Sequence, residues 1–169
     1  MIMKKWARHY WLPSVVTFIV VTLMTVGMVS VSEAADKKAI IGAWYVDTCG
    51  APFAPHGISF HADGIVDLTN PDAAEAQNSS SAGMGEWIAT KDGYKGAFFE
   101  VNADKTTNKF TTLLVVKFEV KVNGNTFNGP ATAEYFDGNR TLVAGPFPAT
   151  LKGQRFTVTG PVPDPVEEC

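Results

Sequence analysis

The chain has few of the residue types that bind metals or carry out redox chemistry. Its 169 residues include only two cysteines and three histidines, and no two of them stand at a C-x-x-C or H-x-x-x-H spacing. We therefore expect neither a metal site nor a cofactor. Basic residues number 14 against 17 acidic ones, for a net charge of −3, and without a basic stripe the chain lacks the electrostatic signature of nucleic-acid binding. Long helix-forming runs are missing too, which excludes helical crossovers between parallel strands.

The first 35 residues have the pattern of a secretory signal peptide. A positively charged start is followed by an uncharged, mostly apolar run over 15–32. The small residues Ser32 and Ala34 then predict cleavage after Ala34 or Ala35, leaving about 135 residues, enough for one domain. The alternative is an uncleaved anchor, because roughly 18 apolar residues can just span a bilayer. In both cases we expect the folded part to be secreted or periplasmic, with a membrane contact only through an uncleaved 1–35 segment.

The two cysteines are Cys49, near the end of the first predicted strand, and Cys169, the last residue. In an oxidising compartment an even number of cysteines favours a disulfide, and two free thiols are the alternative. Closing a loop of about 120 residues would stabilise the fold by roughly 4 to 5 kcal/mol in the chain-entropy model. The bridge would hold the Pro-rich tail, residues 161–169, against the first strand.

Residues 36–160 alternate between strand and turn signals. The most regular stretch is 110–122, where period two holds over about thirteen residues and places the even-numbered side chains inside. Leu113 and Val115 are apolar exceptions on its outer face, and Asn123-Gly124 is a strong hairpin signal directly after it. Further strands are predicted at residues 40–47, 56–61, 65–69, 86–90, 94–101, 125–136, 140–151 and 154–159, with a loop at 70–83 and a turn at 152–153.

Eight or nine strands joined by hairpins predict an all-β fold, specifically an antiparallel up-and-down (meander) β-barrel over residues 36–160. Closure is preferred to an open sandwich because an open meander would leave two long, poorly protected edges. Pro146 and Pro148 cannot donate hydrogen bonds to a neighbouring strand, so they mark an edge, bulge or kink in the penultimate strand.

The predicted inner face is rich in aromatic side chains and nearly free of charge. If it encloses a cavity, it suits a small hydrophobic or aromatic ligand. If its side chains pack on one another it is a solid core, because eight strands leave just enough room to be filled. The small residues Gly129, Ala131 and Ala133 favour a cavity. The inner set comprises Phe60, Trp87, Phe110, Leu114, Phe118, Phe127, Tyr135 and Phe156. We predict that all of these except Phe156 bind the ligand.

Three ionisable residues are candidates for acid–base catalysis. Glu100 would be a general-acid candidate if buried, but both faces of the strand at 94–101 are apolar, so its direction stays open. Tyr135 points inward by alternation, and a buried phenol needs a hydrogen-bond partner. Alternation predicts that His56 points into the barrel near its mouth and that His61 points to the opposite side of the strand. A hydrogen-bonded tyrosine at the mouth and a rim histidine are the simpler interpretations of Tyr135 and His56.

Two short patterns at opposite ends of the domain resemble the lipocalin and calycin group. Gly42-x-Trp44 opens the first strand, and Gly153-Gln154-Arg155-Phe156 opens the last. In that family the tryptophan closes one end of the barrel and the arginine packs across it, which implies structural roles for Gly42, Trp44 and Arg155. Such stacking is worth about 0.5 to 2 kcal/mol. The family's T-D-Y motif and C-terminal helix are absent, so the chain looks like a shortened, exported bacterial lipocalin-like domain.

Three functions follow as hypotheses. The first is an exported barrel that binds or carries a small hydrophobic or aromatic molecule, with the loop at 70–83 as a lid. The second is an isomerase or cyclase, as small calycin-like and allene-oxide-cyclase-like barrels can be, with Glu100, Tyr135 and His56 converging on one cavity. The third is a structural or inhibitor-like module with a solid core. The volume and lining of the barrel interior separate these hypotheses.

Overall fold

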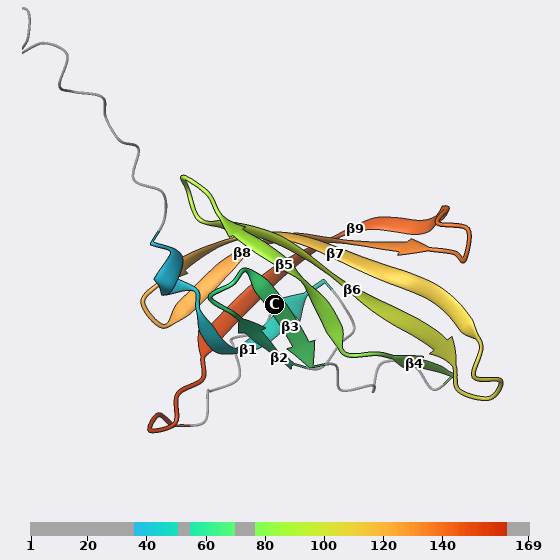
Figure 1. The fold of residues 1–169 in the computed structure, drawn as a ribbon, viewed down its shortest axis with the longest axis horizontal. Helices are drawn as coiled ribbons and strands as arrows, with labels where there is room; N and C mark the ends of the chain where they lie inside the picture. Colours follow the sequence, from blue (N-terminus) through green and yellow to red (C-terminus); the bar gives the residue numbers. More distant parts are fainter. Residues whose placement is uncertain (1–35, 51–54, 70–76, 162–169) are drawn as a thin grey trace, which may run out of the picture. The chain divides into compact units, whose positions relative to one another are not determined.

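The computed structural model describes residues 36–50, 55–69 and 77–161 (Figure 1). The predicted signal peptide, most of the Pro-rich tail and Cys169 lie outside these residues, so cleavage, export and the disulfide stay predictions. Within the described ranges, no helix is long and apolar enough to cross a membrane.

The regular secondary structure of the described residues is almost entirely β. A short 3₁₀ turn, η1 (Lys37–Ala39), precedes the first strand. The strands are β1 (Gly42–Cys49), β2 (His56–Phe60), β3 (Ile65–Thr69), β4 (Asn78–Ser80), β5 (Gly83–Ala89), β6 (Tyr94–Asp104), β7 (Phe110–Asn123), β8 (Thr126–Phe136) and β9 (Leu142–Arg155).

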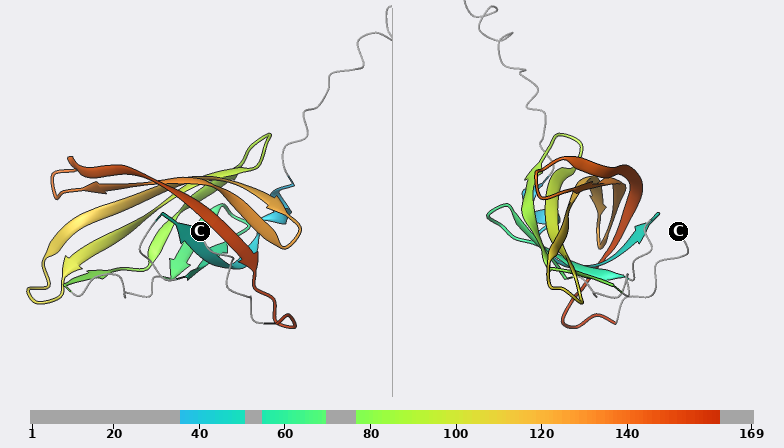
Figure 2. Two further views of the ribbon diagram at one scale, coloured as in Figure 1. Left: turned by 180° about the vertical axis from the view of Figure 1, so that it is seen from behind. Right: turned by 90° about the vertical axis from the view of Figure 1, so that its right-hand side faces the viewer.

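Eight of these strands form a closed antiparallel ring, which confirms the predicted meander barrel. The order is β1-β2-β3-β5-β6-β7-β8-β9, and β9 pairs back with β1. The ring is seen end-on in the right-hand view of Figure 2. The ninth strand, β4, pairs with β6 beyond the end of β5: Ser80 lies opposite Asn102, whereas Met84 lies opposite Phe99. β4 and β5 therefore follow one another along the same edge of β6.

The structure corrects two boundaries of the predicted strands. The segment 70–83, predicted to be a loop, contains β4 and the first residue of β5, while its residues 70–76 lie outside the described ranges. Lys152 and Gly153 do not form a turn, because β9 continues through both and pairs with β1 on one side and β8 on the other. Gly153 is needed for space, since a Cβ there would lie 2.2 Å from the ring of Phe127.

Pro146 and Pro148 lie in β9, in the part where it has one neighbour among the described strands. The pairing of β9 with β1 ends at Cys49 opposite Thr150, and beyond that point β9 pairs with β8 alone. The register of that pairing shifts between Ala133 and Tyr135. A strand edge with an irregular register tolerates residues that lack an N–H donor, as predicted.

The interior near β1 is a solid aromatic core. Trp44 packs edge-on against Phe127 at 5.0 Å between ring centroids, and Phe60 contacts Trp87, Phe118 and Phe127 at about 6 Å. All five rings are at most 5% exposed. Burial of such side chains contributes about 1.5 to 3 kcal/mol each. This core fills the end of the barrel at which η1 lies.

Candidate functional site

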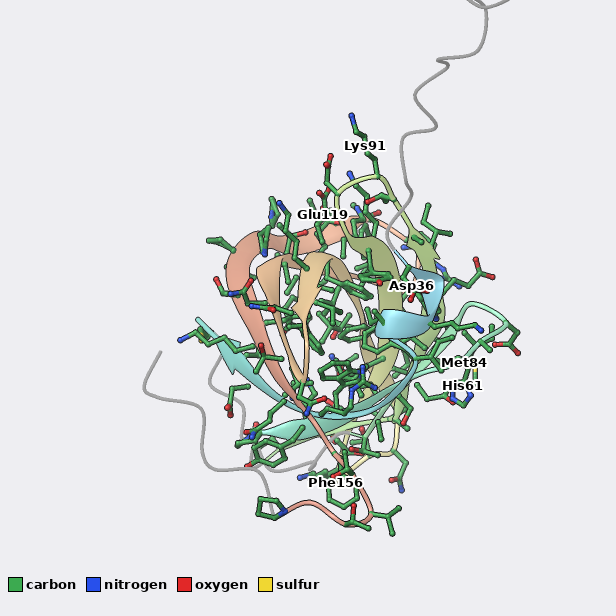
Figure 3. All side chains as sticks on the ribbon, turned by 90° about the vertical axis from the view of Figure 1, so that its left-hand side faces the viewer. Asp36, His61, Met84, Lys91, Glu119 and Phe156 are labelled. Atoms are coloured by element: carbon green, nitrogen blue, oxygen red, sulfur yellow. The ribbon has the colours of Figure 1, made fainter. Side chains whose placement is uncertain are left out.

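The end of the barrel beside η1 is sealed by Trp44 and Arg155. These residues are register partners across β1 and β9, and the guanidinium carbon lies 4.1 Å from the centroid of the indole ring. The indole N–H donates to the carbonyl of Ile40 at 2.8 Å. The hydroxyl of Tyr94 donates to the backbone carbonyl of Asp36. In Figure 3, Asp36 lies in front of the closed ring of strands. The indole N–H and the Tyr94 hydroxyl at this end are therefore both hydrogen-bonded to the backbone.

A small enclosed cavity lies inside the barrel towards its other end. Its volume is about 50 Å³, enough for a few water-sized groups. Every strand of the closed ring except β5 contributes to its wall. The lining comprises Thr48, His56, Leu68, Phe98, Glu100, Leu114, Val116, Thr132, Ala133, Ala149 and Leu151.

Glu100 and His56 reach this one cavity from different strands. Glu100 is 4% exposed, and the inward row of β6 that it shares with Tyr94 and Phe98 is buried. His56, at the start of β2, is half-buried and faces the same space. A carboxyl and an imidazole in a mostly apolar wall can exchange protons with a bound molecule and hydrogen-bond to it.

Tyr135, the third predicted catalytic residue, does not line the cavity. It lies two residues beyond Ala133 on the same face of β8 and is half-buried. Its ring contacts that of Phe147 on β9, with 6.2 Å between centroids. The two rings therefore stand between the enclosed cavity and the far ends of β8 and β9.

Polar side chains continue beyond Glu100 along the inner face of β6. Asn102 is buried, and its side-chain oxygen accepts a hydrogen bond from the Ser80 hydroxyl at 2.7 Å. Its amide nitrogen donates to the Thr112 hydroxyl at 3.0 Å. The inner face thus changes from aromatic at the sealed end to polar at the other. Within the cavity, the Thr48 hydroxyl is buried without a hydrogen-bond partner among the described residues.

The predicted ligand-binding residues do not form a single site. Phe60, Trp87, Phe118 and Phe127 belong to the solid core, and Leu114 lines the cavity.

Two side chains predicted to point inward are exposed. Phe110 is 46% exposed because the β6–β7 register shifts where β7 begins, and the alternation does not extend to its first residue. Phe156 is 55% exposed because it follows the last residue of β9 and lies outside the ring, towards the bottom of Figure 3.

Thr48, Phe98 and Asn102 were not among the site residues predicted from the sequence. Period-two alternation could have placed all three on the inner face. Thr48 shares the face of Trp44 on β1, and Phe98 and Asn102 share the face of Glu100 on β6.

Other ionisable groups lie away from the cavity. His61 forms an ion pair with Asp67 at 3.0 Å, and both side chains are about half exposed on the outer surface. Within residues 36–50, 55–69 and 77–161, no three His, Cys, Asp or Glu side chains could hold a metal ion together.

No protein-family model, curated protein or solved structure matches the chain.

Proposed function

We propose that this protein is an exported, lipocalin-like barrel that binds a small, largely apolar molecule carrying one polar group. The observation that carries the proposal is that Glu100 and His56 face one enclosed cavity whose remaining wall is mostly apolar. The eight-stranded meander and the Trp44–Arg155 closure support the lipocalin-like assignment. The N-terminal apolar run supports export.

The size of the cavity limits what can enter it. Pockets for drug-sized ligands measure about 300 to 1,000 Å³, whereas the enclosed space is about 50 Å³. Only the polar group and a few adjoining atoms fit there without rearrangement. The apolar remainder would lie along the inner face beyond the cavity, against Tyr135 and Phe147.

A purely structural barrel would not need this arrangement. Burying a carboxyl group, an imidazole and a hydroxyl together costs free energy unless each is satisfied, and aliphatic side chains of equal volume would pack with less penalty. Keeping Glu100, His56 and Thr48 in one cavity therefore favours recognition of a polar group.

A matched series of ligands tests this proposal. Decanoic acid, decanol and decane share a chain and differ only in their polar end. Calorimetric titration is expected to give saturable one-to-one binding for the acid or the alcohol and none for decane. Filling the cavity with Ala149→Leu should abolish binding, while His61→Ala on the outer surface should not change it. The proposal would be contradicted if all three compounds bound with equal affinity, or if none of them bound.

Isomerisation or cyclisation of an apolar substrate is the second candidate, favoured by the same pair of residues. One group could remove a proton from carbon while the other returns a proton elsewhere on the substrate, leaving the proton count unchanged. Tyr135 has no place in this scheme because it lies outside the cavity wall. Incubation in D₂O with unsaturated ketones, followed by NMR, distinguishes turnover from binding: deuterium incorporation that is lost in Glu100→Gln supports the enzyme.

A further inference from the structure

The outer face of β6 and β7 carries apolar side chains where water would favour polar ones. Phe99 is 43% exposed and lies opposite Met84 of β5, which is 57% exposed, and opposite Val115 of β7. Val101 lies opposite Leu113. Met84, Phe99, Val101, Leu113 and Val115 are called the outer apolar patch. Strands that are apolar on both faces are typical of strands covered on both faces.

This face is also hollowed, although the outside of a barrel is ordinarily convex. Two surface hollows, of about 970 and 480 Å³, meet at Ala97 and Phe99. The strands come close together beneath them: a Cβ at Gly85 would lie 1.9 Å from the Ala97 carbonyl oxygen. A concave apolar surface with an aromatic side chain at its centre has the anatomy of a protein–protein contact rather than of scattered exposed residues.

The two ends of the outer apolar patch carry opposite charges. Glu86 lies opposite Ala97 at one end, and Arg140 lines the smaller hollow with Val101 and Leu113 at the other. Neither Glu86 nor Arg140 forms an ion pair with another described residue. Nearby lysines are already paired, Lys95 with Glu119 at 2.6 Å and Lys117 with Glu134 at 2.8 Å.

Arg140 is held in place by its turn. Its N–H donates to the Asp137 carbonyl at 3.0 Å, and the Asp137 carboxylate accepts from the N–H groups of Asn139 and Thr141, each at 2.8 Å. The guanidinium therefore projects from a fixed backbone at the edge of the outer apolar patch.

We propose that the outer apolar patch binds a second copy of this chain, related by a twofold axis near Phe99. A half-turn about that axis exchanges the two ends of the patch, so Arg140 of each copy meets Glu86 of the other. Contacts of this self-complementary kind define twofold dimers. An anionic membrane would instead call for several unpaired basic residues around the patch. Here both neighbouring lysines are paired, and the single unpaired cation among the described residues there, Arg140, is matched by an unpaired carboxylate, Glu86, at the other end. The inference does not depend on the proposed ligand.

Apolar patches on monomers are ordinarily smaller than a standard interface. The largest apolar patch on a monomer measures about 300 to 600 Å², whereas a standard interface covers about 800 Å² on each partner. The charged flanks must therefore join the contact, and a dimer of about micromolar affinity is expected.

The experiment is sedimentation velocity of the protein recovered after expression of the full chain, from about 1 to about 100 µM. The wild type is expected to shift from monomer to dimer over this range. Phe99→Glu should remain monomeric, whereas Phe156→Ser, which removes an exposed aromatic ring outside the outer apolar patch, should behave as the wild type. Near-UV circular dichroism shows whether each variant keeps its packed core.

A charge exchange identifies the partner as a second copy. E86R and R140E should each weaken the dimer about tenfold or more, and the double variant E86R/R140E should restore it. A wild type that stays monomeric, a dimer unaffected by Phe99→Glu, or no restoration in the double variant would overturn the proposal. Flotation with anionic lipid vesicles is the last arm: binding by a monomer that Phe99→Glu abolishes would assign the patch to a membrane instead.

Discussion

The guanidinium of Arg155 lies over the indole ring of Trp44, 4.1 Å from its centroid, and bonds to the chain just before that tryptophan. Its two terminal nitrogens donate to the carbonyls of Ile41, at 2.8 Å, and Ala39, at 2.5 Å. One side chain thus joins the last strand, the first strand and η1. The end of the barrel is therefore closed by a guanidinium group whose two terminal nitrogens both donate hydrogen bonds to backbone carbonyls.

Replacing Arg155 by alanine is expected to lower the free energy of unfolding by about 2 to 5 kcal/mol, since a cation–π contact and two charge-assisted hydrogen bonds are lost. Lys91→Ala is the control, because Lys91 lies in an exposed turn and its removal should change stability by less than about 0.5 kcal/mol. Urea unfolding followed by tryptophan fluorescence measures both. Equal stability of the two variants would contradict a structural role for Arg155.

A side chain at position 42 is expected to lower the stability of the protein. Its φ is +131°, and a Cβ would lie 2.8 Å from the nearer Arg155 nitrogen. Gly124 also has a positive φ, +59°, but a Cβ there would meet nothing within 4 Å. Gly42→Ala should therefore cost about 1 to 3 kcal/mol and more than Gly124→Ala, and part of that cost should disappear when Arg155 is also alanine. Chemical denaturation of the wild type, Gly42→Ala, Gly124→Ala, Arg155→Ala and the double variant Gly42→Ala/Arg155→Ala gives the comparison.

The barrel could be predicted from the sequence because period two and hairpin signals are local. The long alternation in β7 and the Asn123-Gly124 turn identified their elements without tertiary information. Gly153 was mistaken for a turn because a glycine that leaves room for the Phe127 ring looks the same in sequence as one that reverses the chain.

The candidate site was less predictable because it depends on which face of β6 is inside. Both rows of that strand are apolar, and the outer one carries Phe99 and Val101, so alternation alone could not orient Glu100. Whether the aromatic rings pack or leave a cavity is set by how the closed ring brings β2, β5, β7 and β8 together. That packing is a tertiary property, and local sequence patterns do not predict it.

Tyr94 is expected to make stability fall at high pH. Burial, and secondarily the nearby charge of Asp36, raises the pKa of the Tyr94 phenol above its ordinary value of 10.0. Above about pH 10 the unfolded chain loses this proton while the folded protein keeps it, so the free energy of unfolding decreases as pH rises. The contribution is fully present below pH 10 and is lost as pH approaches the folded-state pKa.

The variant Tyr94→Phe isolates this effect. At neutral pH it should cost about 1 kcal/mol, because the hydrogen bond to the Asp36 carbonyl is lost. The difference in unfolding free energy between the wild type and the variant should then shrink between about pH 9 and pH 11. A difference that stays constant over this range would show that Tyr94 titrates alike in both states.

A disulfide between Cys49 and Cys169 is expected to link the first strand to the C-terminus. Cys49 ends β1, opposite Thr150 of β9, while Cys169 lies outside the described residues. Intact-mass measurement before and after reduction should show a gain of two hydrogens. Cys169→Ser should lower stability by about 4 kcal/mol, and adding reductant should then have no further effect. Alkylation of both thiols in the unreduced, denatured protein would contradict the bridge.

Thr48 and Val46 lie two residues apart on the inner face of β1, and exchanging threonine and valine at each position should have opposite effects on stability. The Thr48 hydroxyl is buried in the cavity without a described hydrogen-bond partner, and Val46 is fully buried in the apolar core. Thr48→Val should leave the free protein as stable or up to about 1 kcal/mol more stable, because an unsatisfied hydroxyl is removed. Val46→Thr should cost about 1 to 3 kcal/mol, because an unsatisfied hydroxyl is introduced. If the cavity receives a polar group, Thr48→Val should also weaken binding of decanol or decanoic acid. A variant that gains stability while losing affinity would show that this hydroxyl serves recognition, whereas unchanged binding would remove Thr48 from the site.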